Sequence, residues 1–256
     1  MISDAELAAA LAREAGCLLV EVRRDRAAGV GSADERSDAL LAKVLAEHRP
    51  GDAILSEELA STGDRLAAER VWIIDPLDGT REYGEPGRTD WAVHVALWNS
   101  GDLTAGAVAI PDRDEVWGTR DEVGPPVGRP IRRIAVSRTR PPAWALRVAE
   151  ELGAQIVPMG SAGAKVAAVL RGDVDAYLHD GGQYEWDSAA PTVVARHYGY
   201  FAARADGGSL GYNKPNPYLP DLVVCPPAAA EDLLTHIRRH RVEEPLTGPL
   251  VGGTAT

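Results

Sequence analysis

Apolar residues at the start of the chain recur with the spacing of amphipathic helices. Residues 3–25 carry one apolar face, formed by Leu7, Leu11, Leu18, Leu19 and Val22. A loop over 27–34 leads into a second helical pattern over 35–48, which Pro50 and Gly51 end. The pattern therefore predicts two helices before the first strand.

Short apolar runs separated by turn residues follow, and such runs are typical of β-strands. The runs at 52–58 and 70–75 both end in acidic residues. Those at 91–98, 103–111 and 115–120 have the turn-separated spacing of an antiparallel meander. The first half of the chain is therefore expected to be helical at first and then rich in strands.

A Gly- and Pro-rich segment over 121–130 separates this half from a second pattern, and we interpret it as a linker. Beyond it, strands are expected at 131–137, 154–160, 174–179, 200–203 and 221–225. Helices are expected at 141–153, 162–172, 187–199 and 229–240. This alternation predicts an α/β lobe, so we expect two lobes, 1–124 and 125–256.

The charge of the chain narrows the classes of partner. The 256 residues carry a formal net charge of −11, and the pI is near 5.0. A nucleic-acid polymer is disfavoured as the main partner, because contacts to a phosphate backbone need a basic face. A small phosphorylated ligand is compatible with this charge if metal ions supply positive charge locally.

Targeting signals and cysteines bear on the location. The N-terminal residues lack the basic flank and apolar core of a signal peptide. No apolar run approaches the roughly 18 residues that a membrane helix needs. We interpret Cys17 and Cys225 as buried small apolar residues rather than as a disulfide pair. These features predict a cytoplasmic protein that has no membrane partner.

Acidic residues follow three of the apolar elements: Glu57 and Glu58, then Asp75 and Asp78, and finally Asp187. Each group taken alone has a simple structural explanation. Glu57 and Glu58 fit a solvated loop equally well. Asp187, taken alone, is better explained as the cap of the helix that follows it, because Asp is a favoured N-cap residue.

The pair Asp75 and Asp78 is harder to explain structurally. Carboxylates at the end of a buried strand must be desolvated unless a positive group meets them. No Lys or Arg lies in 71–80, so a local salt bridge is excluded, whereas Mg²⁺ prefers such oxygen ligands. In a two-metal site Asp75 could bridge the ions and Asp78 flank them, with the Leu77 carbonyl as a further ligand.

Gly79 and Thr80 follow these acids with the chemistry of a helix start. Backbone N–H groups at such a start bind phosphate oxygens, and glycine allows a close approach. The pattern therefore indicates hydrolysis of a phosphate ester. A covalent aspartyl mechanism of the haloacid-dehalogenase kind is excluded, because its D-x-D-G-T motif needs an aspartate where this chain has Pro76.

Three blocks together carry a family resemblance: SEE at 56–58, DPLDGT at 75–80 and EWDSAAP at 185–191. In this order they resemble the inositol monophosphatase-like family of Mg²⁺-dependent, lithium-sensitive phosphatases. Within it the chain is most similar to the CysQ type, the 3′(2′),5′-bisphosphate nucleotidases. These remove a phosphate from adenosine 3′,5′-bisphosphate, a by-product of sulfate assimilation. The resemblance implies an αβαβα sandwich of the inositol monophosphatase and fructose-1,6-bisphosphatase type, two or three Mg²⁺ ions per site and a homodimer.

Carried over residue by residue, the resemblance implies a metal site and a water-activating group. The implied metal ligands are Glu57, Asp75, the Leu77 carbonyl, Asp78 and Asp187. Glu57 thereby also belongs to the catalytic set, and Glu58 would lie just outside the ligands. Asp34 and Thr80 would orient and help to deprotonate the water that attacks phosphorus in line.

The resemblance also implies the contacts to the substrate. The implied contact residues are Gly79, Thr80, Arg81, Ser161, Ala162, Lys165 and Tyr184, with Gly160 and Gly163 beside them. Lys165 is the position suited to a second phosphate, although a lysine on a helix surface would look the same. Tyr184 and Asp180 are candidates for base or ribose contacts.

Two alternatives stay open. One is an inositol-1-phosphatase or a fructose-1,6-bisphosphatase that uses the same metal site. The other is a non-catalytic protein that senses a metal or a nucleotide. This option is disfavoured by the joint presence of Glu57, Asp75, Asp78, Thr80 and Asp187, since a sensor need not keep a water-activating threonine. His94 is expected to be structural, and Trp72, Trp91 and Trp98 are expected in the core.

Overall fold

The computed structural model describes residues 2–25, 30–58, 63–124, 126 and 130–241. Its helices are α1 (Asp4–Arg24), α2 (Val30–His48), α3 (Thr80–Gly84), α4 (Ala143–Leu152), α5 (Ala162–Arg171), α6 (Glu185–His197) and α7 (Pro227–His240). Its strands are β1 (Ala53–Ser56), β2 (Arg70–Asp78), β3 (Ala92–Asn99), β4 (Asp102–Ile110), β5 (Glu115–Gly118), β6 (Arg133–Ser137), β7 (Gln155–Met159), β8 (Ala176–Tyr184), β9 (Phe201–Ala203) and β10 (Tyr218–Cys225). Short 3₁₀ turns lie at Gly63–Leu66 and Pro111–Arg113.

The first half of the chain forms one sheet in the order β1-β2-β3-β4-β5. Strand β1 pairs with β2 in parallel, and β2 through β5 pair antiparallel. The meander expected from the spacing of the apolar runs is therefore confirmed. Strand β2 joins this meander to β1, the parallel strand at the edge of the sheet.

The second half forms a mixed sheet in the order β7-β6-β8-β10-β9. Strand β6 is parallel to both β7 and β8, with helices α4 and α5 in the connections. Strand β10 is antiparallel to β8 and β9. The alternation of strands and helices in the sequence thus produced the expected α/β arrangement.

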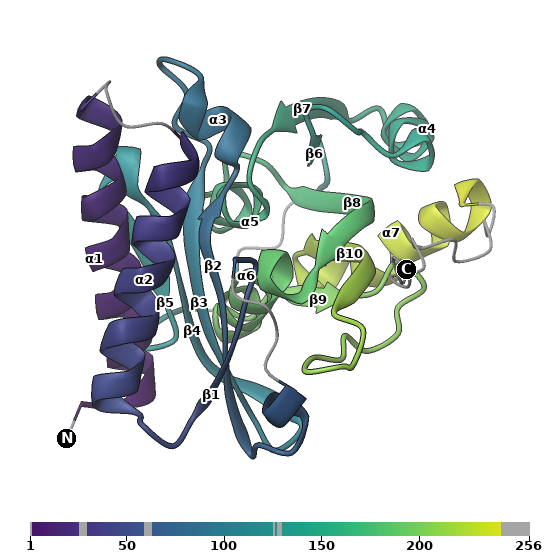
Figure 1. The fold of residues 1–256 in the computed structure, drawn as a ribbon. Coiled ribbons are helices and arrows are strands. Elements are labelled where there is room, and N and C mark those ends of the chain that lie inside the picture. The colour runs from purple at the N-terminus through teal and green to yellow at the C-terminus, as the bar shows by residue number, and fades with distance from the viewer. Residues whose placement is uncertain (1, 26–29, 59–62, 125, 127–129, 242–256) are drawn as a thin grey trace, which may run out of the picture.

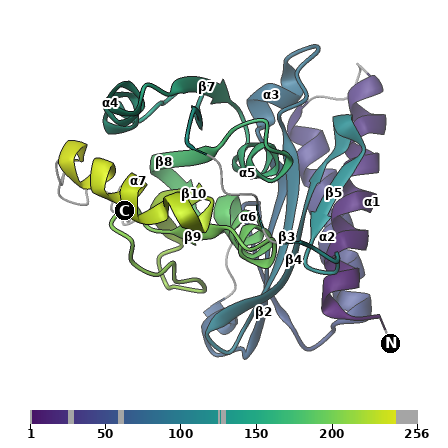
Figure 2. The ribbon, with the colours of Figure 1, turned by 180° about the vertical axis from the view of Figure 1, so that it is seen from behind.

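The helices and sheets stack in five layers (Figures 1 and 2), and three apolar cores hold the layers together. Helices α1 and α2 pack on the outer face of the first sheet through residues such as Leu11, Leu41 and Trp72. Helices α5 and α6 fill the space between the two sheets, and α4 and α7 cover the outer face of the second. The layered αβαβα sandwich is therefore confirmed. The division into lobes at residue 124 stays a prediction.

Several boundaries differ from those expected, and the differences matter for the site. Helix α2 begins at Val30, so Asp34 lies on a helix and not in the expected loop. Strand β2 continues to Asp78, so Asp75 lies inside the strand. Strand β8 continues through Gly181 and Gly182, and α6 begins at Glu185, two residues before Asp187. Short-range patterns missed the longer β2 and β8 because pairing of β2 with β3, and of β8 with β10, keeps these segments extended.

The cysteines and tryptophans follow the sequence prediction only in part. Cys225 is buried, but Cys17 is exposed on α1, which contradicts its expected burial; both are free thiols. Trp72 and Trp91 are fully buried, and Trp98 packs against the central core while partly exposed. Among the described helices, none has the length and apolarity needed to cross a bilayer.

Candidate functional site

Strand β2 brings two aspartates to the centre of the molecule. Asp75 lies opposite His94 of β3, and the pairing shifts register before Asp78. The intervening bulge is held in place by two bonds: the Leu77 N–H donates to Asp75 Oδ1 (3.1 Å), and Ser37 Oγ donates to the Pro76 carbonyl (2.8 Å). Both carboxylates therefore face the same region between β2 and the second half of the chain.

Five carboxyl groups converge on this region: Asp34, Glu57, Asp75, Asp78 and Asp187. Burial raises the pKa of Asp75 well above its usual range, and the charges of the other four raise it further. Burial also raises the pKa of Asp187, and the charge of Asp78 adds to this effect. These mutual effects place the residues of all three sequence blocks at one point.

The two acids contributed by α2 and the end of β1 have pKa values near neutrality. Burial raises the pKa of Asp34 to about 7, with contributions from Glu58 and Glu57. The side chain of Glu57 is partly exposed, but its carboxyl is largely desolvated. This desolvation, together with the charges of Asp78 and Glu58, raises the pKa of Glu57 to about 7 as well. A site with such pKa values attracts cations strongly.

Asp78 is fixed by the second half of the chain. Its Oδ2 accepts a hydrogen bond from Ser161 Oγ (2.5 Å) and one from the Gly163 N–H (3.2 Å). Ser161 is also the N-cap of α5, where its Oγ accepts from the Ala164 N–H (3.0 Å). The start of α5 therefore positions a carboxylate of β2.

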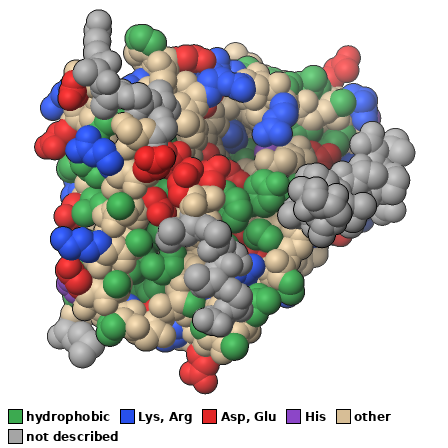
Figure 3. All heavy atoms as spheres, in the orientation of Figure 1, with side chains coloured by type: hydrophobic (Ala, Val, Ile, Leu, Met, Phe, Trp, Pro, Cys, Tyr) green, Lys and Arg blue, Asp and Glu red, His purple; other side chains and the backbone are tan. Residues whose placement is uncertain are grey.

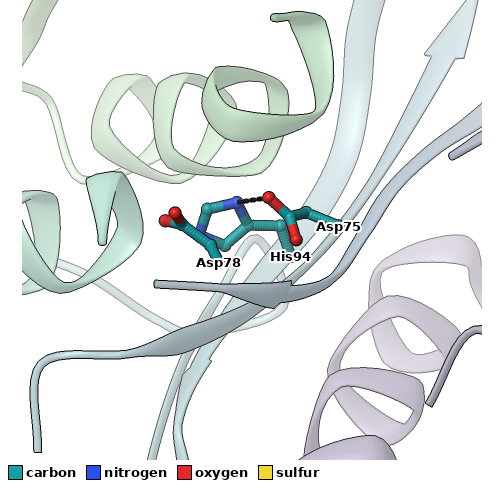
Figure 4. Close-up of side chains that lie close together, drawn as sticks. All are labelled: Asp75, Asp78 and His94. Carbon is teal, nitrogen blue, oxygen red and sulfur yellow. Dashed lines mark ion pairs between the residues drawn. The ribbon is translucent and has the colours of Figure 1, made fainter. Parts of the chain in front are cut away.

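His94 lies between the two aspartates of β2 (Figure 4). It is fully buried, and burial lowers its pKa. Its Nδ1 is 3.1 Å from the Trp186 carbonyl, which only accepts, so the ring proton belongs on Nδ1. Its Nε2 is 3.2 Å from Asp78 Oδ2. His94 offers a nitrogen within 4.8 Å of oxygens of Asp75 and Asp78, and its expected structural role stays a prediction.

The donor set fits a divalent cation. Asp75 Oδ2 is buried without a hydrogen-bond partner among the described residues, and so is Asp34 Oδ1. An unpaired buried carboxylate is costly, and carboxylate oxygens are the ligands that Mg²⁺ and similar cations prefer. A bound cation would satisfy the oxygens that the protein leaves unpaired.

A cavity of about 430 Å³ opens beside these acids. Its lining residues come from both halves of the chain and include Asp78, Asp187 and the basic residues Arg81, Arg138, Arg140, Lys165 and His179. Figure 3 shows acidic side chains gathered near the middle of one face, beside a hollow that has basic side chains on its other side. A ligand that is itself anionic would be held between the cations of this wall and a metal at the acids.

Gly79, Thr80 and Arg81, which the sequence analysis expects to contact the substrate, line the cavity. Gly79 has φ +89°, and a Cβ there would meet the Asp90 carbonyl and Trp91 at 3.3 Å, so this turn requires glycine. Helix α3 has only five residues, so single N–H groups rather than a long helix dipole would contact an anion. Thr80 Oγ1 donates to the Leu77 carbonyl (3.1 Å), and its expected pairing with Asp34 stays a prediction.

The substrate residues predicted in the second half divide into two groups. Ser161, Ala162 and Lys165 line the cavity, although the Ser161 hydroxyl is already bonded to Asp78. Tyr184 lies outside the cavity lining and stacks on Trp186 with the ring centroids 4.9 Å apart. Asp180 lies outside it too and accepts from Trp144 Nε1 at 2.5 Å. The structure therefore brings the first group to the ligand cavity and not the second.

Sequence reasoning missed several residues of the cavity wall, among them Arg138, Arg140, His179 and Gln183. Arg138 follows β6 directly and Arg140 lies two residues further on, so both stand just beyond the end of an apolar strand, and this position was a usable signal. His179 is the last residue of the strand expected at 174–179, and Gln183 lies on the extension of β8 beyond it, which Gly181 and Gly182 concealed.

The chain combines a layered αβαβα fold with carboxylates that converge beside a cavity lined by basic residues. This combination is typical of the class of proteins that bind metal ions next to an anionic ligand. The model of the inositol monophosphatase family matches residues 5–155 and 135–243. The chain therefore belongs to the inositol monophosphatase family.

Two relatives and one solved structure are particularly similar. A 3′-phosphoadenosine 5′-phosphate phosphatase of Mycobacterium leprae is 49% identical over 255 residues, covering 93% of this chain and 94% of the relative. One of Mycobacterium tuberculosis is 51% identical over 235 residues, covering 86% and 88%. The inositol monophosphatase structure from Anabaena shares the fold, with a TM-score of 0.78 over 93% of this chain and 96% of that one, at 21% identity.

Proposed function

We propose that this protein is a metal-dependent phosphatase that converts adenosine 3′,5′-bisphosphate and water to AMP and phosphate. The relatives that are about half identical over most of both chains are named for this substrate, which is the same compound as 3′-phosphoadenosine 5′-phosphate. The observation that carries the proposal is the convergence of five carboxyl groups, two of them with an unpaired buried oxygen, at the wall of a cation-lined cavity.

The metal would be held by the residues that the sequence predicted. We propose Glu57, Asp75, the Leu77 carbonyl, Asp78 and Asp187 as ligands, and Mg²⁺ as the ion, with two or three per site. Bound cations would neutralise the substrate phosphate and lower the pKa of the attacking water. The bonds from Ser161 and Gly163 keep Asp78 oriented while Asp75, fixed by the Leu77 N–H, faces the ions from the strand.

The protein's own base would be Asp34. Its pKa of about 7 lets it accept a proton near neutral pH, and it lies beside Glu57 and Glu58 on the side of the cluster formed by α2. We propose that the Thr80 hydroxyl passes the proton of the attacking water towards Asp34. No covalent intermediate on the protein is needed, because Pro76 stands where a nucleophilic aspartate would be required.

The scissile phosphate would lie between the acids and the first turn of α3. Gly79, Thr80 and Arg81 line the cavity at the carboxylate end, and Ser161 and Ala162 face them from α5. Arg81 is exposed and keeps its charge available for a phosphate oxygen. Tyr184 lies outside the cavity, and its stack with Trp186 would support the helix that carries Asp187 rather than contact the substrate.

The family also supports finer proposals. We propose inhibition by lithium, a homodimer, a cytoplasmic location and a role in recycling the nucleotide by-product of sulfate assimilation. The first three are measured by inhibition curves with LiCl, by sedimentation of the purified chain and by fractionation of the source cells.

A competition assay tests the central proposal. Purified enzyme with Mg²⁺ is given adenosine 3′,5′-bisphosphate, inositol 1-phosphate and fructose 1,6-bisphosphate in parallel, and phosphate release is measured. The largest kcat/KM is expected for the nucleotide. A preference for inositol 1-phosphate or the sugar bisphosphate would assign the other phosphatase activity of this site, and no release from any of the three would contradict a catalytic role.

A further inference from the structure

The basic side chains of the cavity wall differ in whether they are already bonded to other groups of the protein. Arg138 donates from Nε and Nη2 to Glu82 Oε1 (3.0 and 2.7 Å), and from Nη2 to Glu85 Oε1 (2.8 Å). Glu82 is buried, so this pair is largely shielded from solvent. Arg138 therefore has little charge left for a ligand.

Lys165 is also occupied. Its side chain is buried with 4% exposed, and Nζ donates to the Gly160 carbonyl. Nζ lies 5.0 Å from the centre of the Tyr177 ring. Burial lowers the pKa of Lys165 to about 8, while the acids near it act in the opposite direction. Its ammonium thus holds the turn before α5 and partly balances the acid cluster.

Arg140 is different. It is exposed at the cavity wall, and its guanidinium forms no ion pair with an acid in the described part of the chain. The guanidinium lies against Gly182, where any Cβ would collide with Nη1. Gly182 has φ +70°, so both its conformation and its missing side chain make room for this arginine.

His179 lies near Arg140 on the same wall. It is 5% exposed, and neither ring nitrogen completes a hydrogen bond with a described residue, although the Gly181 backbone lies close. Burial lowers the pKa of His179 to about 3, and the neighbouring charges of Lys165 and Arg140 add to this effect. The neutral ring therefore faces the cavity with one N–H to donate and one nitrogen to accept.

Gln183 adds an acceptor beside them. Its Nε2 donates to the Tyr177 hydroxyl (2.9 Å), which fixes the amide, and its buried Oε1 has no partner among the described residues. A buried acceptor of this kind is costly unless a ligand supplies a donor. A plain anion would not satisfy it, whereas the hydroxyl of a sugar would.

We propose that Arg140 and His179 form a second-anion subsite, which binds the phosphate of the substrate that is not hydrolysed, and that Gln183 accepts a hydrogen bond from the sugar. This proposal rests on the proposed function, since it assigns the second phosphate of the same substrate. It makes Arg140 and His179, and not Lys165, the residues that separate bisphosphates from monophosphates.

Paired substrates test this subsite. Arg140→Gln is compared with wild type on adenosine 3′,5′-bisphosphate and on adenosine 3′-monophosphate, which lacks the second phosphate. Because a hydrogen bond to a charged group contributes about 1.5–3 kcal/mol, kcat/KM for the bisphosphate is expected to fall about 10- to 100-fold, mainly through KM. The value for the monophosphate is expected to stay within about twofold of wild type, since that substrate makes no such contact. Arg13→Gln, on the exposed surface of α1, removes the same charge elsewhere and is the control.

A second variant and a binding measurement complete the test. His179→Leu, checked for folding by circular dichroism, is expected to show the same selective loss. An equal loss on both substrates, in either variant, would overturn the subsite. If wild type releases no phosphate from the bisphosphate, the proposed function fails instead. The subsite is then judged by calorimetric binding of adenosine 5′-monophosphate, which Arg140→Gln must weaken.

Discussion

Ser161 Oγ donates a hydrogen bond of 2.5 Å to Asp78 Oδ2, and this bond joins the first helix turn of α5 to the last residue of β2. The two residues are 83 positions apart in the chain. The orientation of a proposed metal ligand therefore depends on how the two sheets are assembled around α5.

Ser161→Ala tests this relationship. Removal of the hydroxyl leaves Asp78 Oδ2 with the Gly163 N–H as its remaining hydrogen-bond donor among the described residues, so the carboxylate is less well oriented. Loss of a partner that orients a ligand costs about 10- to 100-fold in metal affinity or activity, and a loss in this range is expected for Mg²⁺ affinity measured by calorimetry. Ser161→Thr keeps both the hydroxyl and the cap and should restore most of it. Equal affinities in wild type and the alanine variant would contradict the positioning role.

Asp75→Asn is expected to abolish phosphate release while the fold persists. Asp75 is buried among four other acids, so neutralising it removes repulsion in the metal-free protein and takes away the oxygen proposed to bridge the ions. The variant should therefore have a higher melting temperature in EDTA than wild type and a smaller increase on adding Mg²⁺. Near-normal turnover would exclude the proposed metal mechanism.

The sequence predicted the acids of this site better than it predicted their setting. Asp75 and Asp78 were identified because no nearby Lys or Arg could neutralise them. Their place inside β2 was missed, because pairing with β3 keeps Pro76 and Leu77 in the strand. Such pairing is a long-range contact that no local pattern records.

The cavity wall was harder to predict for a related reason. Arg140 and His179 are 39 residues apart in numbering and are brought together by the pairing of β6 with β8. A basic residue after a strand and a histidine within one look unremarkable alone. Lys165 lines the cavity, but its burial and its bond to Gly160 depend on packing against Tyr177.

The stability of the metal-free protein is expected to fall as pH rises from about 4 to 7. The pKa values of Asp34 and Glu57 are raised to about 7, so in this window the unfolded chain has lost protons that the folded chain keeps. Burial also raises the pKa of Asp75 and acts in the same direction. Hydrogen bonds with His236 and His240 lower the pKa of Glu151 to about 2. The stability that this carboxylate contributes is therefore lost only as the pH falls below this window.

Thermal unfolding in EDTA and in excess Mg²⁺ checks this dependence. The melting temperature in EDTA should decrease from pH 5 to pH 7.5, and the increase caused by Mg²⁺ should be larger at pH 7.5, because ligands must be deprotonated to bind. Asp75→Asn should flatten the profile in EDTA. A melting temperature that rises over this range in EDTA would show that the acid cluster does not control stability.

Gly163→Ala is expected to destabilise the fold and to weaken metal binding. A Cβ at this position would collide with His94 Nε2 and would lie 2.8 Å from Val108 Cγ1, in a fully packed region. Overpacking of a core costs about 1–3 kcal/mol, so a lower melting temperature is expected. Gly51→Ala is the matched control, because a Cβ there meets nothing within 4 Å. Equal stability of the two variants would mean that β3 and α5 can separate at no cost.

Lys165→Met distinguishes a positioning role from a contact with the second phosphate. Methionine keeps the length of the side chain and its packing on Tyr177, but it removes the bond to the Gly160 carbonyl and one positive charge beside the acids. If Lys165 holds the turn before α5, kcat should fall about 10-fold or more on adenosine 3′,5′-bisphosphate and on adenosine 3′-monophosphate alike. Lys43→Met, on the exposed surface of α2, should change neither value. A loss confined to the bisphosphate would return the second phosphate to Lys165, and Arg140→Gln should then leave the preference between the two substrates unchanged.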